Sequence, residues 1–369
     1  MGSRQPSTAR AMNSGGPWAE NKTELRSKSC GWKCGTAAGL VALLVLSGVP
    51  AYADESGLDA SGLPLPYRYA WVRHDDTPVY AAPGDPAQMT PVRFMFSNMW
   101  VSIVEETGTE QEVWYGIGRE EYVRGEDLWL AKPSAFQGIP LGDQREWVPG
   151  FVVGKDVNVR ARPGAAWDNP PVGTLQYYDL VRVLEYVGAA DGAWYRIGEG
   201  QYVHSDYVRV VTAAPRPDGV SPDDRWIAID LAEQTLVAYE GERAVYATIV
   251  STGLPWWATP GGLFQIQRKI RAGDMRGSGE DGVVYYLVQD VPWTMYFHKG
   301  YALHAAYWHD GFGHPRSRGC VNLSPRDAKW LFDWSTPTLL GEDPHVLASQ
   351  DDPGTWVYVY SAPAEDALR

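Results

Sequence analysis

The chain has 369 residues, too many for one ordinary hydrophobic core and enough for two or three domains. Its formal net charge of −13 argues against nucleic acid as a partner, because an acidic surface repels phosphates. It contains 17 Trp and 21 Tyr but only 8 Phe, and its short β-branched and aromatic runs are broken by Gly and Pro. This pattern predicts a mainly β protein.

Residues 1–53 have the layout of a signal peptide with a long basic and polar first region. Basic residues precede an apolar run at 36–49, and Ala51-Tyr52-Ala53 fits an A-x-A cleavage site. The run is shorter than the about 20 residues of a membrane helix, and an uncleaved N-terminal membrane anchor is the alternative. We expect a secreted, extracytoplasmic protein of the cell wall or periplasm. Cys30 and Cys34 would leave with the signal, so the mature chain would keep only Cys320.

An internal repeat follows. Sliding the chain by 80 residues aligns two segments without a gap, which predicts two copies of one β-domain at 66–131 and 147–212. The matching phrases are 79–84 with 159–164, 101–105 with 181–185, and 114–118 with 194–198.

The second copy resembles a bacterial SH3-like domain. The resemblance rests on Val157-Asn158-Val159-Arg160-Ala161-Arg162-Pro163 and on Trp194-Tyr195-Arg196-Ile197, whereas the first copy is divergent and lacks the Asn-x-Arg phrase. It implies two small β-barrels that either bind cell-wall polymers or act as spacers. A Pro-rich linker at 213–224 is expected to be stiff, and deletion of residues 67–212 is expected to leave a C-terminal fragment that is competent without the two copies.

The remaining residues, 225–361, alternate as strands do. Runs at 226–230, 235–239 and 244–250 are followed by a turn at 259–264 and by further strands at 283–288 and 355–360. Ser324 is a predicted helix N-cap, with Pro325 at the first helical position. The expected fold is a β-sandwich with one short helix after Cys320.

Cys320 is the candidate nucleophile. An unpaired thiol in an exported protein is exposed to oxidation, so its presence beside Gly319 favours a chemical role over that of a small buried hydrophobe. A free thiol is only a few per cent ionised at pH 7, and His304, sixteen residues earlier, could take its proton. The backbone amides of Gly319 and Cys320 could bind the oxyanion.

The phrases at 229–236, 259–264 and His304…Ser317-Arg318-Gly319-Cys320-Val321-Asn322 together resemble the L,D-transpeptidase (YkuD-type) family. The resemblance implies that Cys320 and His304 are catalytic and that the carbonyl of Ala305 orients the imidazole. Two residues depart from the usual pattern, since Ala305 replaces Gly and Arg318 replaces the commoner His. We expect the charge of Arg318 to lower the pKa of Cys320.

Several further residues are candidates for the site. Ser317 belongs to the motif and is grouped with the oxyanion and orienting residues. Trp257, Trp293, Tyr296 and Asn322 are candidates for substrate binding, with core packing as the alternative for the aromatic residues.

Four histidines, at 298, 304, 309 and 314, lie close to Cys320 in the sequence. Their spacing matches no common zinc pattern, so no metal is expected. His309 and His314 flank Asp310-Gly311-Phe312-Gly313, which is expected to be a flexible loop, with its histidines either exposed to solvent or in contact with an acidic stem peptide.

The resemblance implies a cysteine acyltransferase that remodels peptidoglycan. A tetrapeptide stem would acylate Cys320 with release of a D-amino acid, and an amine on another stem would form a 3-3 cross-link; water would make the enzyme an L,D-carboxypeptidase, and a protein amine an anchoring enzyme. Such activity serves peptidoglycan biosynthesis, cell wall organisation and cell shape. No cofactor is implied, and a monomer is expected. The alternative is a catalytically weak or inactive cell-wall-binding protein.

Overall fold

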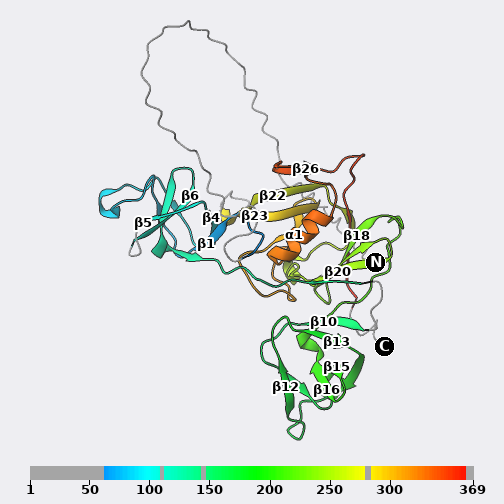
Figure 1. Ribbon diagram of the computed structural model, residues 1–369. Helices are drawn as coiled ribbons and strands as arrows, with labels where there is room; N and C mark the ends of the chain where they lie inside the picture. Colours follow the sequence, from blue (N-terminus) through cyan, green and yellow to red (C-terminus); the bar gives the residue numbers. More distant parts are fainter. Residues whose placement is uncertain (1–61, 109–111, 143–146, 279–283, 363–369) are drawn as a thin grey trace, which may run out of the picture. The chain divides into compact units, whose positions relative to one another are not determined.

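The computed structural model describes residues 62–108, 112–142, 147–278 and 284–362 (Figure 1). The predicted signal peptide, Cys30 and Cys34 lie outside the described residues. Strands dominate the described part, with short 3-10 turns and one α-helix, α1 (Pro325–Trp334), after Cys320. The prediction of a mainly β protein with one short helix is confirmed.

The first copy of the repeat forms three small groups of strands: β4-β1-β8, β2-β3 and β5-β6-β7. Alternate side chains such as Val72, Val101 and Val123 are fully buried between them, as the period of two requires. The strands are β1 (Arg68–Val72), β2 (Thr77–Val79), β3 (Arg93–Met95), β4 (Met99–Ile103), β5 (Glu105–Gly108), β6 (Val113–Gly118), β7 (Glu121–Arg124) and β8 (Leu128–Leu130), with 3-10 turns at Pro86–Gln88 and Gly125–Asp127.

The second copy repeats this arrangement. Its sheets have the orders β13-β10-β17 and β12-β11-β16-β15-β14, and β10 and β17 lie 80 residues after β1 and β8. The strands are β10 (Val148–Val152), β11 (Val157–Arg160), β12 (Pro171–Leu175), β13 (Leu180–Val183), β14 (Glu185–Ala189), β15 (Gly192–Gly198), β16 (Gln201–His204) and β17 (Val208–Val210), with a 3-10 turn at Ser205–Tyr207. The 80-residue offset in sequence is thus also an offset in strand position and pairing.

The C-terminal part has two sheets with one core between them. One sheet has the order β21-β27-β18-β19-β20, and the other contains β23, β24 and β25, with α1 beside β22 and β23 in Figure 1. Buried side chains from both sheets and from α1 share this core, including Ile229, Met295 and Leu331. The elements are β18 (Arg225–Asp230), β19 (Thr235–Glu240), β20 (Arg243–Ile249), β21 (Gly262–Gln265), β22 (Arg268–Ser278), β23 (Val284–His298), β24 (Tyr301–Ala305), β25 (Val321–Leu323), β26 (His345–Leu347) and β27 (Trp356–Tyr360), with a 3-10 turn at Pro255–Trp257.

The helix begins as the sequence predicts. The side-chain oxygen of Ser324 accepts a hydrogen bond from the amide of Asp327 at 3.1 Å, and Pro325 occupies the first helical position. Asp327 itself is buried and accepts hydrogen bonds from Tyr246 and Thr248, both at 2.6 Å. Asp327, in the first turn of the helix, therefore ties the helix to β20.

Both connecting segments pack against the C-terminal part. In the join between the copies, β9 (Ile139–Pro140) pairs with β20. In the stretch 213–224, the Ala214 amide donates to the Tyr239 hydroxyl at 2.9 Å, and Val220 is buried. This proline-rich stretch is therefore packed against the domain along part of its length.

The first copy also shares a sheet with the C-terminal part. Strand β4 runs parallel to β23, with Met99 opposite Leu287 and Trp100 opposite Val288. The resulting order, β25-β24-β23-β4-β1-β8, runs from the strand that follows Cys320 to the far edge of the first copy.

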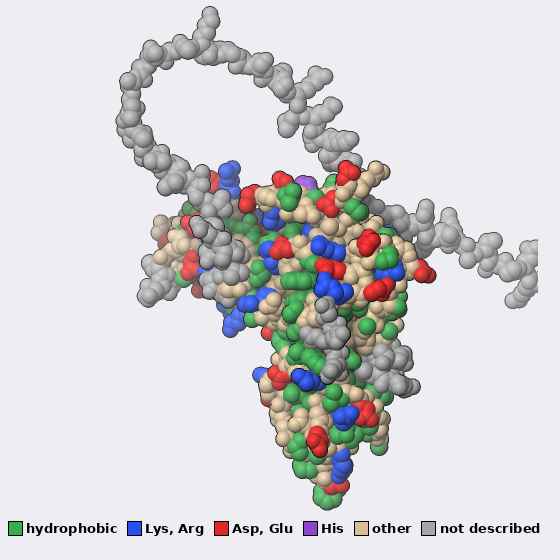
Figure 2. Space-filling view, turned by 45° about the vertical axis from the view of Figure 1, so that its right-hand side comes forward, with side chains coloured by type: hydrophobic (Ala, Val, Ile, Leu, Met, Phe, Trp, Pro, Cys, Tyr) green, Lys and Arg blue, Asp and Glu red, His purple; other side chains and the backbone are tan. Residues whose placement is uncertain are grey.

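On the face shown in Figure 2, acidic and basic side chains are interspersed. Within the described residues, no helix combines the length and apolar character needed to cross a membrane.

Candidate active site

Cys320 lies at the end of a tight loop that leads into β25. The Ser317 side-chain oxygen accepts a hydrogen bond from the Gly319 amide at 2.9 Å and donates one to the Cys320 carbonyl. Gly319 has φ +112, and a Cβ there would lie 2.3 Å from a ring carbon of Tyr301. Only glycine fits this position, because both the backbone angle and the contact exclude a side chain.

The turn at 259–264 supports this loop from the other side. The Thr259 hydroxyl donates to the Gly319 carbonyl and accepts from the Gly253 amide, both at 2.9 Å. The Leu254 amide donates to the Ser317 carbonyl at 3.0 Å. The turn at 259–264 thus helps to fix the backbone of the loop that carries Ser317, Gly319 and Cys320.

His304 lies on β24, opposite Asn322 of β25. Its imidazole is buried, and Nδ1 is 3.1 Å from the Ala305 carbonyl oxygen. A carbonyl only accepts hydrogen bonds, so Nδ1 carries the proton and Nε2 keeps its lone pair. Burial lowers the pKa of His304 to about 4, so the ring is neutral at pH 7 and can act as a base.

Burial also determines the direction in which the pKa of the Cys320 thiol is shifted. It raises the pKa of Cys320 above its ordinary value, and a hydrogen bond from the Ala302 amide offsets part of the rise. At pH 7 the site therefore holds a thiol and a neutral imidazole rather than an ion pair. The expectation that the pKa of Cys320 is lowered was wrong.

The contacts of Arg318 explain why its charge does not lower the pKa of Cys320 as expected. Its guanidinium lies 4.3 Å from the ring centre of Tyr286 and 5.1 Å from that of Trp257, so it is engaged by aromatic faces. Arg318 lines the cavity that contains Cys320.

The proposed substrate residues lie in different environments. Trp257 is 46% exposed next to Arg318, whereas Trp293 is buried in the core and donates from its indole nitrogen to the Pro64 carbonyl at 2.7 Å. Trp293 is thus a core residue, the alternative that sequence left open. Burial raises the pKa of Tyr296, whose ring packs against the Arg268 guanidinium at 4.7 Å from its centre; Tyr296 is not among the residues that line the cavity of Cys320. Asn322 is buried, with its Nδ2 3.1 Å from Nε2 of His309.

His309 is the residue that sequence reasoning undervalued. Its side chain is largely buried, and burial lowers its pKa to about 3. It lines the same cavity as His304, and its Nδ1 has no hydrogen-bond partner among the described residues. The expectation of a solvent-exposed loop histidine was wrong for His309, and its position between aromatic residues Trp308 and Phe312 was the signal available in sequence.

The second copy of the repeat holds the loop that carries His309. Tyr178 donates to the Asp310 carboxylate at 2.6 Å, and Arg209 donates to the Gly313 carbonyl at 2.8 Å. His314 Nε2 lies 3.1 Å from the Val153 carbonyl oxygen and donates to it. Because partners outside the loop fix both of its ends, the expected flexible loop is instead anchored.

His298 packs against Phe264 with tilted rings, 4.8 Å between ring centres, and is not among the residues that line the cavity. Within the described ranges, no group of three His, Cys, Asp or Glu residues is arranged to hold a metal ion.

A cavity of ≈ 940 Å³ joins these groups. Its described lining includes two arginines and no Asp or Glu, and three of its residues come from the first copy of the repeat. It is lined by Trp71, Asn98, Trp100, Met275, Tyr286, Val288, Gly300, Tyr301, His304, Trp308, His309, Arg316, Ser317, Arg318, Cys320 and Asn322.

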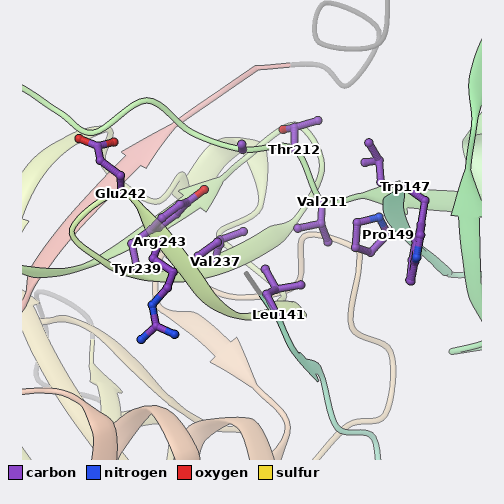
Figure 3. Close-up of a pocket in the computed structure, with 13 residues that line it drawn as sticks. Leu141, Trp147, Pro149, Val211, Thr212, Val237, Tyr239, Glu242 and Arg243 are labelled. Carbon is purple, nitrogen blue, oxygen red and sulfur yellow. The ribbon is translucent and has the colours of Figure 1, made fainter. Parts of the chain in front are cut away.

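A smaller cavity of ≈ 300 Å³ lies elsewhere, between the second copy and strands β19 and β20 (Figure 3). Mostly apolar side chains face it, among them Leu141, Trp147 and Val237. Its lining contains neither His304 nor Cys320, so the larger cavity is the candidate active site.

The fold and the larger cavity define a β-sandwich protein with a cysteine and a neutral histidine in one pocket. Residues 224–359 match the family model of YkuD, the L,D-transpeptidase catalytic domain. This part of the chain is a YkuD L,D-transpeptidase catalytic domain. The SH3-like interpretation of the two copies stays a prediction.

Three solved L,D-transpeptidase structures are similar in sequence to part of this chain. An L,D-transpeptidase from Stackebrandtia nassauensis is 27% identical, with 39% of this chain and 58% of that chain covered and a TM-score of 0.27. The catalytic domain of the E. faecium L,D-transpeptidase is 25% identical, with 37% and 98% covered and a TM-score of 0.30. One from Xylanimonas cellulosilytica is 26% identical, with 40% and 65% covered and a TM-score of 0.27. These TM-scores are too low for the superpositions to support a conclusion about the fold or function of this chain. The comparison with curated proteins finds no match.

Proposed function

We propose that this protein is an exported cysteine L,D-transpeptidase that remodels or cross-links peptidoglycan through a thioester on Cys320. One observation carries the proposal. His304, with its lone pair on Nε2, and Cys320 line the same cavity of a YkuD catalytic domain.

The two neutral groups suit general-base catalysis. As Sγ attacks a carbonyl carbon of the stem peptide, its proton passes to Nε2 of His304, and the carbonyl becomes an oxyanion. The imidazolium then gives this proton to the departing D-amino acid, and the C–N bond breaks to leave the thioester. An acceptor amine repeats these steps in reverse order and frees the thiol.

The oxyanion needs hydrogen-bond donors. The Gly319 amide already donates to Ser317, which leaves the Cys320 amide as the better candidate of the two that the sequence suggested. Ser317 then acts by shaping the loop, since it holds both the Gly319 amide and the Cys320 carbonyl.

The remaining parts of the proposal concern substrate and place. The donor is a tetrapeptide stem, and a second stem's amine, water or a protein amine accepts the acyl group. Arg316 and Arg318 line the cavity, where they suit the carboxylates of such a peptide. The protein acts outside the cytoplasm as a monomer, without a cofactor, and the two SH3-like copies contribute contacts to the wall.

Incubation with purified muropeptides, followed by mass spectrometry, tests the activity. We expect 3-3 cross-linked dimers or shortened stems with the wild type, and their loss in Cys320→Ser, because a hydroxyl is a far poorer nucleophile beside imidazole alone. His304→Ala should lower the rate by roughly 10²–10⁴-fold. Circular dichroism should show that both variants remain folded.

The alternative is a cell-wall-binding protein with a weak or inactive site. Intact-mass measurement after exposure to a carbapenem separates the two, because an active thiol forms a covalent adduct. A wild-type protein that binds wall sacculi but gains no mass and makes no product would establish the alternative.

A further inference from the structure

Three tryptophans form one row across the first copy of the repeat. Trp71 of β1 is directly opposite Trp100 of β4 on one side and Trp129 of β8 on the other. Paired residues of neighbouring antiparallel strands share a face of the sheet, so the three rings lie on the same side. The ring centres of Trp71 and Trp129 are 5.0 Å apart, and those of Trp71 and Trp100 are 6.4 Å apart.

The row continues into the candidate active site. Trp100 is opposite Val288 of β23, and Val288 is opposite Met275 of β22. Trp71, Trp100, Val288 and Met275 all line the cavity that contains Cys320. Strands are spaced about 4.8 Å apart, so the three tryptophans span about 10 Å, and Trp129 extends the row one strand beyond the lining of the cavity.

The three tryptophans are not part of the hydrophobic core of the first copy. Trp129 is 51% exposed, and Trp71 and Trp100 are only partly buried, whereas the opposite face of β1 and β4 supplies Ala70, Val72 and Val101 to that core. A continuous row of one exposed and two partly exposed tryptophans favours a binding surface.

The chemistry of the cavity changes along its length. The Cys320 end carries Arg316 and Arg318, which suit an anionic peptide, whereas the tryptophan end adds only the uncharged Asn98 to its aromatic rings. A pyranose ring presents a face of C–H groups that packs on an indole, and its hydroxyls bond to amides and indole N–H groups. The Arg73 guanidinium, 4.9 Å from the Trp129 ring centre, adds a donor at the outer end.

We propose that Trp129, Trp71 and Trp100 bind sugar rings of the glycan strand whose stem peptide reaches Cys320. This inference rests on the proposed function, because it assigns the two ends of one substrate to the two ends of one cavity. The first copy is then part of the substrate site itself.

The test compares two donors that differ only in the sugar: the free tetrapeptide and the disaccharide-tetrapeptide. Trp71→Ala and Trp129→Ala should each raise KM for the disaccharide-tetrapeptide roughly three- to tenfold, the size of one aromatic contact. Trp129→Ala, at a residue outside the lining of the cavity, should leave kcat and the free-tetrapeptide KM unchanged. Trp167→Ala, which removes a 95% exposed tryptophan of the second copy, is the matched control and should change none of these values. Thermal unfolding checks that each variant is folded, and Trp129, being exposed, gives a variant that should fold even if Trp71→Ala does not.

A binding arm separates this inference from the proposed function. Peptide-free glycan strands are titrated into Cys320→Ala and into Cys320→Ala with Trp129→Ala, and heat is measured by calorimetry. Weaker binding in the second protein supports the row even if no muropeptide is turned over. Equal glycan binding by both proteins, or an equal loss for the two donors in the kinetic arm, would overturn it, since the row would then contact peptide or only shape the cavity.

Discussion

The two copies of the repeat place the same three strands side by side but use that face in opposite ways. In the first copy, the row Trp129–Trp71–Trp100 borders the cavity of the active site. Eighty residues later, the equivalent row is Arg209–Phe151–Leu180. Phe151 is buried against the outer face of the sheet that contains β18 and β19, and Arg209 holds Gly313. One sequence pattern thus borders the cavity in the first copy and attaches the second copy to the C-terminal domain.

The copies also differ in how they reach the catalytic residues. The first copy joins through backbone pairing of β4 with β23 and through stacked rings of Tyr69 and Tyr307, whose centres are 3.5 Å apart. The second copy joins through side-chain hydrogen bonds to the loop that carries His309. The first attachment is part of a sheet and a core, whereas the second sets the position of a loop.

Deletion of residues 1–131 should have the largest effect. Val291 and Tyr307 are fully buried in a cluster with Leu63 and Leu65, and the deletion would expose them to water and leave β23 with an open edge. We expect poor solubility, a lower melting temperature and loss of carbapenem labelling at Cys320. This revises the expectation that a fragment without the repeats stays competent. A truncated protein that melts and labels like the full chain would mean that the shared sheet contributes nothing.

Loss of the loop contacts from the second copy should have a smaller effect, on rate more than on stability. Tyr178→Phe with Arg209→Ala removes the hydrogen bonds to Asp310 and Gly313. We expect kcat to fall roughly 10- to 100-fold, because small displacements of site residues are costly. Arg196→Ala, which breaks an exposed ion pair with Glu185 in the same copy, is the control. If both proteins turn over muropeptides alike, the loop does not depend on the second copy.

Sequence predicted the elements that depend on local pattern. The strand alternation, the Ser324 cap and the offset of 80 residues needed no long-range information. The roles of the two copies could not be predicted without long-range information. Nothing in the sequence around Trp100 shows that β4 pairs with β23, whose Val288 lies 188 positions later in the chain. Likewise, the pKa of Cys320 depends on burial by distant strands, whereas its neighbour Arg318 points to aromatic faces. Residue types predicted the candidate site, whereas the charge states of its residues depend on tertiary packing.

Two buried histidines, His304 and His309, should make the folded protein less stable in acid. The folded-state pKa values of His304 and His309 are lowered to about 4 and about 3, so the unfolded chain binds more protons below the ordinary histidine pKa of about 6.5. Their stabilising contribution is full above about pH 6.5 and is lost as the pH falls toward 4, by up to about 1.4 kcal/mol per pH unit for each histidine.

Chemical unfolding at several pH values measures this slope. His309→Gln should make it shallower between pH 6.5 and 4, whereas His345→Gln, which replaces an exposed histidine, should not. The same lowered pKa predicts that muropeptide turnover keeps its rate below pH 6.5 while the fold persists. A slope that is identical in wild type and His309→Gln would show that His309 is not held as a buried neutral ring.

The smallest effect is expected for Arg318, at the Cys320 end of the cavity. Its guanidinium packs on Trp257 and Tyr286, and burial rather than this charge controls the pKa of Cys320. Iodoacetamide alkylation of Cys320 should therefore follow nearly the same pH curve in Arg318→Ala as in wild type, while KM for an anionic stem peptide rises modestly because a cation is lost from the cavity. A curve shifted to higher pH in the variant would mean that the guanidinium leaves the aromatic faces and stabilises the thiolate. Substrate recognition and thiol activation would then share one residue, and the division of the cavity into a peptide end and a sugar end would have to include the reacting sulfur.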